Sequence, residues 1–278
     1  MPSAASIKPD SRFFGLFIGR SGSGKSAAAY SFPHPIKVLD LDGRIRGGLV
    51  PWVEREGIDY TYYPPKPDKG TVFDLLNNDF AALQVMCRTG QNYFKTLVLD
   101  SITWATIDLL LDAIPLTHAA GSGNDKGKSI GGMQIGGPAD YQFQSTGIYQ
   151  ILAFLKSLPI PNIIVTAHVV GKWGKRKDAA GKIIDPYGPS ELIGEQLSLT
   201  DKLAENVPSS FDNVFSFEKV DTGSQVKFFF EAQGELARSA YPELPYQRLD
   251  VTGKDFYKFL MEKVQPLVPS TASLTTGS

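Results

Sequence analysis

Long apolar runs recur along the chain, and the segments between them carry apolar residues at helical spacing. Four of the runs end at or beside a polar residue with useful chemistry; they cover residues 13–18, 36–43, 95–101 and 162–168. Strands that are apolar on both faces are typical of a parallel sheet with helices on both sides. The pattern therefore predicts an α/β fold with a doubly wound, mainly parallel sheet.

Helical spacing and turn residues place the other elements. A further strand is expected at 58–63, and two strands joined by a turn at 221–224 form a C-terminal β-hairpin. Helices are expected at 25–31, 71–89, 102–114, 141–158 and 252–264. In the helix at 102–114 we expect the buried face to consist of Trp104, Ile107, Leu110 and Leu111.

The predicted elements make one domain of residues 12–265. Segments 1–11 and 266–278 are rich in Pro, Ser, Ala or Thr and are expected to be disordered. Two internal stretches, 117–138 and 169–191, lack periodic apolar positions. Long irregular stretches inside a compact domain are usually mobile functional loops, although 117–138 could also be a tolerated insertion.

The motif with the clearest chemistry is GRSGSGKS, which lies between the first strand and the first helix. This strand–loop–helix context is what a phosphate-binding loop requires, and it disfavours a chance Gly/Ser-rich turn. Glycines let the backbone N–H groups approach a triphosphate, Lys25 reaches its β- and γ-phosphates, and the Ser26 hydroxyl is placed to ligate Mg²⁺. The predicted nucleotide-binding residues are Gly19, Arg20, Ser21, Gly22, Ser23, Gly24, Lys25, Ser26 and Ala27.

Polar residues at the carboxyl ends of other strands complete the predicted crevice, because ligands bind at that edge of an open parallel sheet. Asp100 ends an apolar strand and is expected to hold the Mg²⁺ shell opposite Ser26. Asp40 and Asp42 end another strand and are candidates for contact with metal or water. His168 has a functional and a structural interpretation, and the sequence does not decide between them.

Composition limits the other interpretations. The chain has 278 residues, of which 42% are hydrophobic and 21% charged, with a net charge of −1, so binding to nucleic acid must come from a local patch. One such patch combines basic residues with an aromatic ring, although it could also be a solvated hairpin. It consists of Lys172, Trp173, Lys175, Arg176 and Lys177.

Cysteine and histidine are scarce, and this limits the possible sites and compartments. A single cysteine excludes an internal disulfide, and together with three scattered histidines it excludes a Cys/His zinc site. No apolar run reaches a membrane-spanning length, and residues 1–11 contain no apolar signal core. We therefore expect a cytoplasmic protein without membrane contact, in a bacterium or in a host cell.

Together these motifs resemble the RecA-type P-loop ATPase core over about residues 13–245, and most closely the short, core-only RecA relatives of bacteriophages. The resemblance implies that Asp42 activates the attacking water, in place of the usual glutamate. It also implies that His168, in place of a glutamine, senses the γ-phosphate. Loops 117–138 and 169–191 would contact DNA, and Arg238 would reach the nucleotide of a neighbouring subunit.

The resulting hypothesis is an ATP- and Mg²⁺-dependent hydrolase that acts on single-stranded DNA in recombination, annealing or repair. The resemblance implies a homo-oligomer with the nucleotide near subunit interfaces, and a single-strand-binding protein is a further candidate partner. The alternative is a P-loop ATPase that serves a protein assembly, such as a virion or packaging component, without direct DNA contact.

Overall fold

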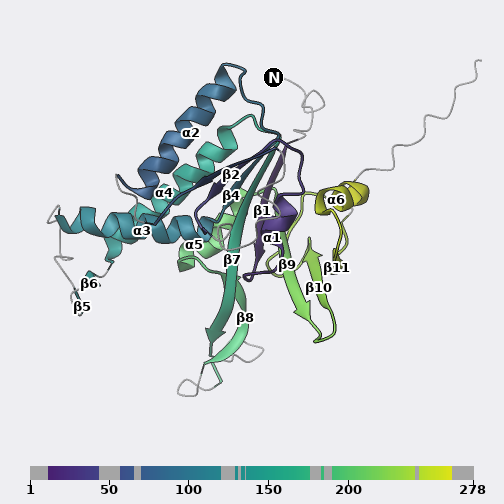
Figure 1. Ribbon diagram of the computed structural model, residues 1–278. Coiled ribbons are helices and arrows are strands. Elements are labelled where there is room, and N and C mark those ends of the chain that lie inside the picture. Colours follow the sequence, from purple (N-terminus) through teal and green to yellow (C-terminus); the bar gives the residue numbers. More distant parts are fainter. Residues whose placement is uncertain are drawn as a thin grey trace, which may run out of the picture.

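A single twisted sheet organises the chain. The computed structural model describes residues 12–43, 57–65, 70–119, 129–130, 133–134, 136–175, 183–184, 190–241 and 244–264. Within these residues the main sheet has nine strands, with the order β11-β10-β9-β1-β7-β4-β2-β3 and with β8 paired to β7 (Figure 1).

Six neighbouring strands of this sheet are parallel, and three additions are antiparallel. The parallel strands are β1 (Phe13–Gly19), β2 (Ile36–Asp40), β3 (Ile58–Tyr62), β4 (Thr96–Asp100), β7 (Asn162–Gly174) and β9 (Asn213–Asp221). The antiparallel ones are β8 (Glu191–Leu197), β10 (Val226–Glu231) and β11 (Leu249–Asp250). A separate short pair consists of β5 (Ser129–Ile130) and β6 (Met133–Gln134).

Helices cover both faces of the sheet (Figure 1). Successive side chains of a strand point to opposite faces, so Phe14, Leu16 and Ile18 of β1 enter one core while Phe13 and Phe17 enter the other. The first core lies under α2 (Val72–Arg88), α3 (Ile102–Ala119), α4 (Pro138–Ser157) and α5 (Asp201–Asn206), the last of which continues into a 3₁₀ turn, Val207–Ser210. The second core lies under α1 (Lys25–Ala29) and α6 (Phe256–Val264).

The second core is rich in phenylalanine, and this fixes the last helix against the sheet. The ring of Phe256 lies 5.1 Å from those of Phe217 and Phe230 and 5.7 Å from that of Phe17, measured between centroids. Such pairs contribute about 0.5–1.5 kcal/mol each beyond the burial of their area. The α6 end of the chain is therefore held beside β9 and β10.

The predicted fold class is confirmed: the chain has a doubly wound, mainly parallel sheet with a C-terminal β-hairpin. The predicted terminal segments 1–11 and 266–278 lie outside the described residues, as does most of 117–138. No helix in the described parts of the chain is long and apolar enough to cross a bilayer.

Three local predictions were wrong. The stretch 169–191 is not wholly irregular, because β7 continues to Gly174 and pairs with β8. The helix expected from 252 begins only at Phe256, because Gly253 has a φ of +69° and turns the chain before it. In α3, Ile107 and Leu111 are 39% and 49% exposed, whereas Leu109 is buried.

One buried group in α3 has no compensating partner. The side chain of Asp108 is buried, and neither of its carboxylate oxygens has a hydrogen-bond partner. Burial, and secondarily the nearby charge of Asp112, raises the pKa of Asp108 to about 7. The neutral acid is thus the form that suits this position.

We expect Asp108→Asn to stabilise the protein increasingly as pH rises. A pKa that folding raises from 3.8 to about 7 gives stability that is fully present below pH 3.8 and is lost as pH rises through 7. The difference in free energy of unfolding between variant and wild type should be near zero at pH 4 and on the order of 4 kcal/mol at pH 8. Thermal unfolding across this pH range measures this difference.

The exposed Asp212 provides the control, since Asp212→Asn should follow the wild-type profile at every pH. Parallel curves for Asp108→Asn and wild type would contradict a neutral carboxyl at this position.

Candidate active site

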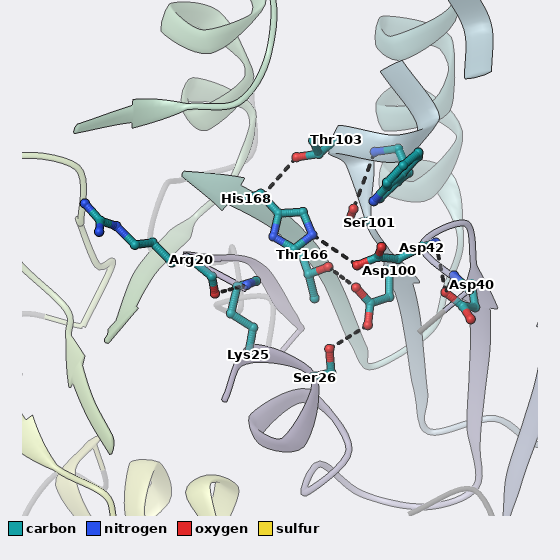
Figure 2. A network of polar contacts seen from close by, with 12 residues as sticks. Arg20, Lys25, Ser26, Asp40, Asp42, Asp100, Ser101, Thr103, Thr166 and His168 are labelled. Atoms are coloured by element: carbon teal, nitrogen blue, oxygen red, sulfur yellow. Dashed lines mark hydrogen bonds and ion pairs between the residues drawn. The ribbon is translucent and has the colours of Figure 1, made fainter. Parts of the chain in front are cut away.

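The predicted phosphate loop occupies the turn from β1 to α1. Gly19 must lack a side chain, because a Cβ there would lie 2.3 Å from the carbonyl oxygen of Phe217 and 2.6 Å from Ser23 Oγ. Lys25 is buried, and its Nζ donates to the carbonyl oxygens of Gly19 and Arg20, both at 2.9 Å (Figure 2). The loop thus curls around its own ammonium group, which provides a fixed positive charge for phosphate.

Asp100 and Ser26 meet as the sequence predicts. Ser26 Oγ donates to Asp100 Oδ2 at 2.6 Å, and Thr166 Oγ1 donates to Asp100 Oδ1 at 2.5 Å (Figure 2). The carboxylate is buried and is held by α1 on one side and by β7 on the other. These hydrogen bonds fix its orientation at the carboxyl edge of the sheet.

The donor set suits Mg²⁺. A serine hydroxyl and one carboxylate are hard oxygen ligands, and Mg²⁺ at phosphate sites usually takes one or two carboxylates together with phosphate and water. In the described part of the chain no cluster of three or more His, Cys, Asp or Glu side chains could hold a metal. Ser26 and Asp100 are therefore the residues that would hold Mg²⁺ together with a nucleotide.

Asp42 and His168 come together across the crevice. His168 Nε2 lies 3.1 Å from Asp42 Oδ2, and the His168 backbone N–H donates to Thr103 Oγ1 at 2.9 Å (Figure 2). Both side chains are largely buried, at 7% exposure for Asp42 and 14% for His168. The two residues with predicted roles at the γ-phosphate are thus one polar pair.

Asp40 has a different environment from Asp42. It is 1% exposed, and its Oδ1 accepts the backbone N–H groups of Asp42 and Gly43 while its Oδ2 accepts the Tyr60 hydroxyl. Burial raises the pKa of Asp40, and these hydrogen bonds partly oppose the rise. Asp40 therefore shapes the turn that places Asp42 beside His168.

The ribbon formed by β7 and β8 is connected to the phosphate loop by an ion pair. Arg20 donates through Nε to Glu195 Oε1 at 3.0 Å, and its second nitrogen lies 2.8 Å from the same oxygen. Both side chains are substantially exposed, so the pair contributes about 0–1 kcal/mol. Replacing this ion pair by another contact of Arg20 therefore costs little free energy.

The predicted basic patch is partly on this ribbon. Lys172 and Trp173 lie in β7, with Trp173 67% exposed, and Lys175 follows the strand. Arg176 and Lys177 lie outside the described residues. Arg238 is in a different setting: its guanidinium donates to the carbonyl oxygens of Pro208 and Phe211, so within this chain it supports a turn.

Sequence reasoning missed the residues that position the predicted ones. Thr166 lies two positions before His168, and strand alternation could have placed both on one face. Thr103 lies three residues after Asp100, in the first turn of α3. Glu195 and Tyr60 gave no signal, because their partners come from other parts of the chain.

We expect Lys25→Ala to reduce nucleoside triphosphate binding or hydrolysis about a hundredfold or more, since the backbone amides alone cannot balance the β- and γ-phosphate charge. Calorimetric titration and phosphate release measure the two effects. The control is Lys95→Ala, which removes an exposed lysine at the opposite end of β4. Hydrolysis at the wild-type rate by the Lys25 variant would contradict the site.

Comparisons with known proteins agree with this geometry. The model of the AAA_24 family, described as an AAA domain, matches residues 15–233, which is well over half of the chain. No curated protein sequence matches the chain.

Two solved structures are similar in outline. The KaiC-like protein PH0186 from Pyrococcus horikoshii OT3 aligns with 12% identity and a TM-score of 0.44, and the flagellar accessory protein FlaH from Methanocaldococcus jannaschii with 13% identity and a TM-score of 0.35. Each alignment covers 87% of this chain and 85% of the other. From the extent of the family match and the site it contains, the chain belongs to the AAA_24 family and is a P-loop ATPase.

Proposed function

We propose that this P-loop ATPase uses Mg²⁺ and ATP to act on single-stranded DNA in recombination, annealing or repair. The observation that carries the proposal is the continuity of β7. This strand passes through the crevice at His168 and continues to Lys172 and Trp173, between which its pairing with β8 shifts in register. One strand thus joins the phosphate end of the site to the basic, aromatic segment.

In this proposal each residue of the crevice has one task. Lys25 balances phosphate charge, and Ser26 and Asp100 hold Mg²⁺, which when bound draws charge from the terminal phosphates. Asp42 orients water and accepts its proton at a carboxylate oxygen, the one that now contacts His168 Nε2. His168 is therefore the group whose contact changes when Asp42 engages water.

Two connections would pass such a change to the ribbon. In the parallel register Gly19 of the phosphate loop pairs with His168, and Arg20 contacts Glu195 on β8. A phosphate group competes well for an exposed arginine, since the ion pair it replaces is weak. Nucleotide binding would thus release the ribbon from Arg20 and leave it attached through β7.

The charges around the ribbon indicate where DNA would bind. A hollow of about 830 Å³ at its base is lined by Lys172 and Arg238 but also by the carboxylates of Glu195, Glu205 and Glu235. Three acids disfavour a phosphate backbone there. The proposed contact is therefore toward the end of β7, where Lys175 follows the strand and Trp173, which also lines the hollow, offers a ring for stacking; Arg176 and Lys177 come next in the sequence.

A second candidate, an ATPase that serves a protein assembly, has one observation in its favour. The ribbon exposes apolar side chains as well as basic ones, with Val170 at 42%, Ile193 at 49% and Leu192 at 53% exposure. Exposed apolar residues on a projecting ribbon suit a protein partner. Response of the ATPase rate to single-stranded DNA separates the two candidates.

Assembly of several copies, with the nucleotide near subunit interfaces, is part of the proposal, as are a cytoplasmic location and a single-strand-binding partner. The role proposed for Arg238 at a neighbouring nucleotide has a structural cost. Its guanidinium would have to leave the carbonyl oxygens of Pro208 and Phe211.

We expect Asp42→Asn to bind ATP with near wild-type affinity but to turn it over roughly a hundredfold more slowly or worse, since an amide cannot accept the proton of the attacking water. Single-turnover hydrolysis and equilibrium binding separate the two quantities. If turnover is unchanged, another group activates the water.

We expect replacement of Lys175, Arg176 and Lys177 by alanine to weaken binding to all single-stranded sequences alike. Loss of three phosphate contacts should lower the slope of log affinity against log salt by about 0.7 per contact. Fluorescence anisotropy of a labelled oligonucleotide over a salt series measures this slope.

Trp173→Ala tests stacking separately, with an expected loss of about 1–3 kcal/mol in the free energy of binding to the oligonucleotide.

The matched control replaces three exposed cations on α2 and α6, Arg88, Lys258 and Lys263, by alanine. This control removes the same charge away from the ribbon and should leave the slope nearly unchanged. Equal slopes for wild type and the ribbon variant would favour the assembly ATPase instead.

A further inference from the structure

A cavity of about 420 Å³ lies beside the phosphate loop, on the side away from Asp100. The loop and α1 form one wall, and β9, β10 and the turn before α6 form the others. Its volume falls in the range of small-molecule sites, roughly 300–1,000 Å³. The residues that line the cavity include Gly24, Ala27, Phe217, Phe228, Val251 and Asp255.

The sheet order places this cavity at the opposite end of the loop from the metal site. Asp100 and His168 lie on β4 and β7, to one side of β1, whereas Phe217 and Phe228 lie on β9 and β10, to the other side. A triphosphate on the loop with its terminal phosphate at Ser26 and Asp100 must direct its remaining part away from them. That direction leads to β9 and β10.

The walls suit a flat aromatic group. Phe228 lies against the loop itself, since a Cβ on Gly24 would be only 3.3 Å from Phe228 Cδ1. Val251 and Ala27 add aliphatic surface, and Asp255 is the acidic group in the lining. An aromatic ring beside small aliphatic side chains favours stacking with another π system.

Hydrogen bonds connect the walls of the cavity to one another. The Phe228 backbone N–H donates to Thr252 Oγ1 at 2.8 Å, and its carbonyl oxygen accepts from the Val251 N–H at 2.9 Å. The Tyr257 N–H donates to Ser31 Oγ at 2.9 Å, which connects α6 to the end of α1. A cavity whose walls are fixed in this way loses little entropy when it binds a ligand.

We propose that this cavity binds the nucleobase of the triphosphate, with a purine stacked on Phe228. The inference rests on the proposed nucleotide site at the phosphate loop and adds the residues that select the base. A purine is the expected class, because its two rings cover more of the Phe228 face than a pyrimidine does.

The test separates base recognition from phosphate recognition by comparing ATP, CTP and inorganic tripolyphosphate on the full chain. In wild type ATP should bind more tightly than CTP. In Phe228→Ala the affinity for ATP should fall about tenfold or more, as expected for a lost stacking partner, and the preference over CTP should shrink toward one. Affinity for tripolyphosphate, which has no base, should stay within about twofold of wild type.

Two further variants guard against a folding artefact. Phe229→Ala is the matched control, because Phe229 is the next residue of β10 and packs under Arg248; it should leave all three affinities unchanged. Ala27→Leu fills the cavity from the α1 side and should also weaken ATP binding while leaving tripolyphosphate binding unchanged. If Phe228→Ala does not fold, Ala27→Leu alone tests the base site.

The opposing outcomes are distinct. Unchanged ATP affinity in Phe228→Ala and Ala27→Leu, or an equal loss for ATP and tripolyphosphate, would overturn the base site and leave the phosphate site standing. Failure of wild type to bind either ATP or tripolyphosphate would overturn the nucleotide site itself, and the base site with it.

Discussion

The carboxylate of Asp100 is held by hydroxyl groups from two elements that are far apart in the sequence, Ser26 of α1 and Thr166 of β7. This arrangement exists only because β4, β7 and β1 are neighbours in one parallel register, in which Gly19 also pairs with His168. Side chains alternate along a strand, so a slip of one residue in β7 would turn Thr166 and His168 to the other face. The buried apolar residues that fix the register therefore also fix the chemistry of the crevice.

The phosphate loop lies between two features that extend in opposite directions. On the β7 side the ribbon leaves the crevice and touches the loop through Arg20 and Glu195. On the β9 side the cavity under Phe228 lies against Gly24. In the proposed function, a nucleotide that spans the loop would contact both features. The rigid Phe-rich core beneath the cavity and the weak ion pair at the ribbon suit these different tasks.

The sequence predicted the parts of the site that lie where apolar strands end, namely Asp42, Asp100 and His168, because burial on both faces leaves a clear signal. It offered the ribbon beyond His168 only as an alternative, a solvated hairpin, since the composition of this largely exposed strand pair is that of a loop. It also placed the wrong face of α3 inward. That helix is apolar on several sides, and its orientation is set by Leu109, which packs on Gly147 of α4, where a Cβ would lie 2.9 Å away. Such a contact depends on tertiary structure and not on periodicity.

Asp40 and Asp42 illustrate how neighbouring carboxylates acquire separate roles. Asp40 is the last residue of β2, and its buried carboxylate accepts three hydrogen bonds. Two of the donors are the backbone N–H groups of Asp42 and Gly43, and the third is the Tyr60 hydroxyl. Protonation of Asp40 would weaken the hydrogen bonds that hold this turn. The same bonds hold Asp42 at the crevice, where its carboxylate lies 3.1 Å from His168 Nε2. The first aspartate thus fixes the turn that carries the second.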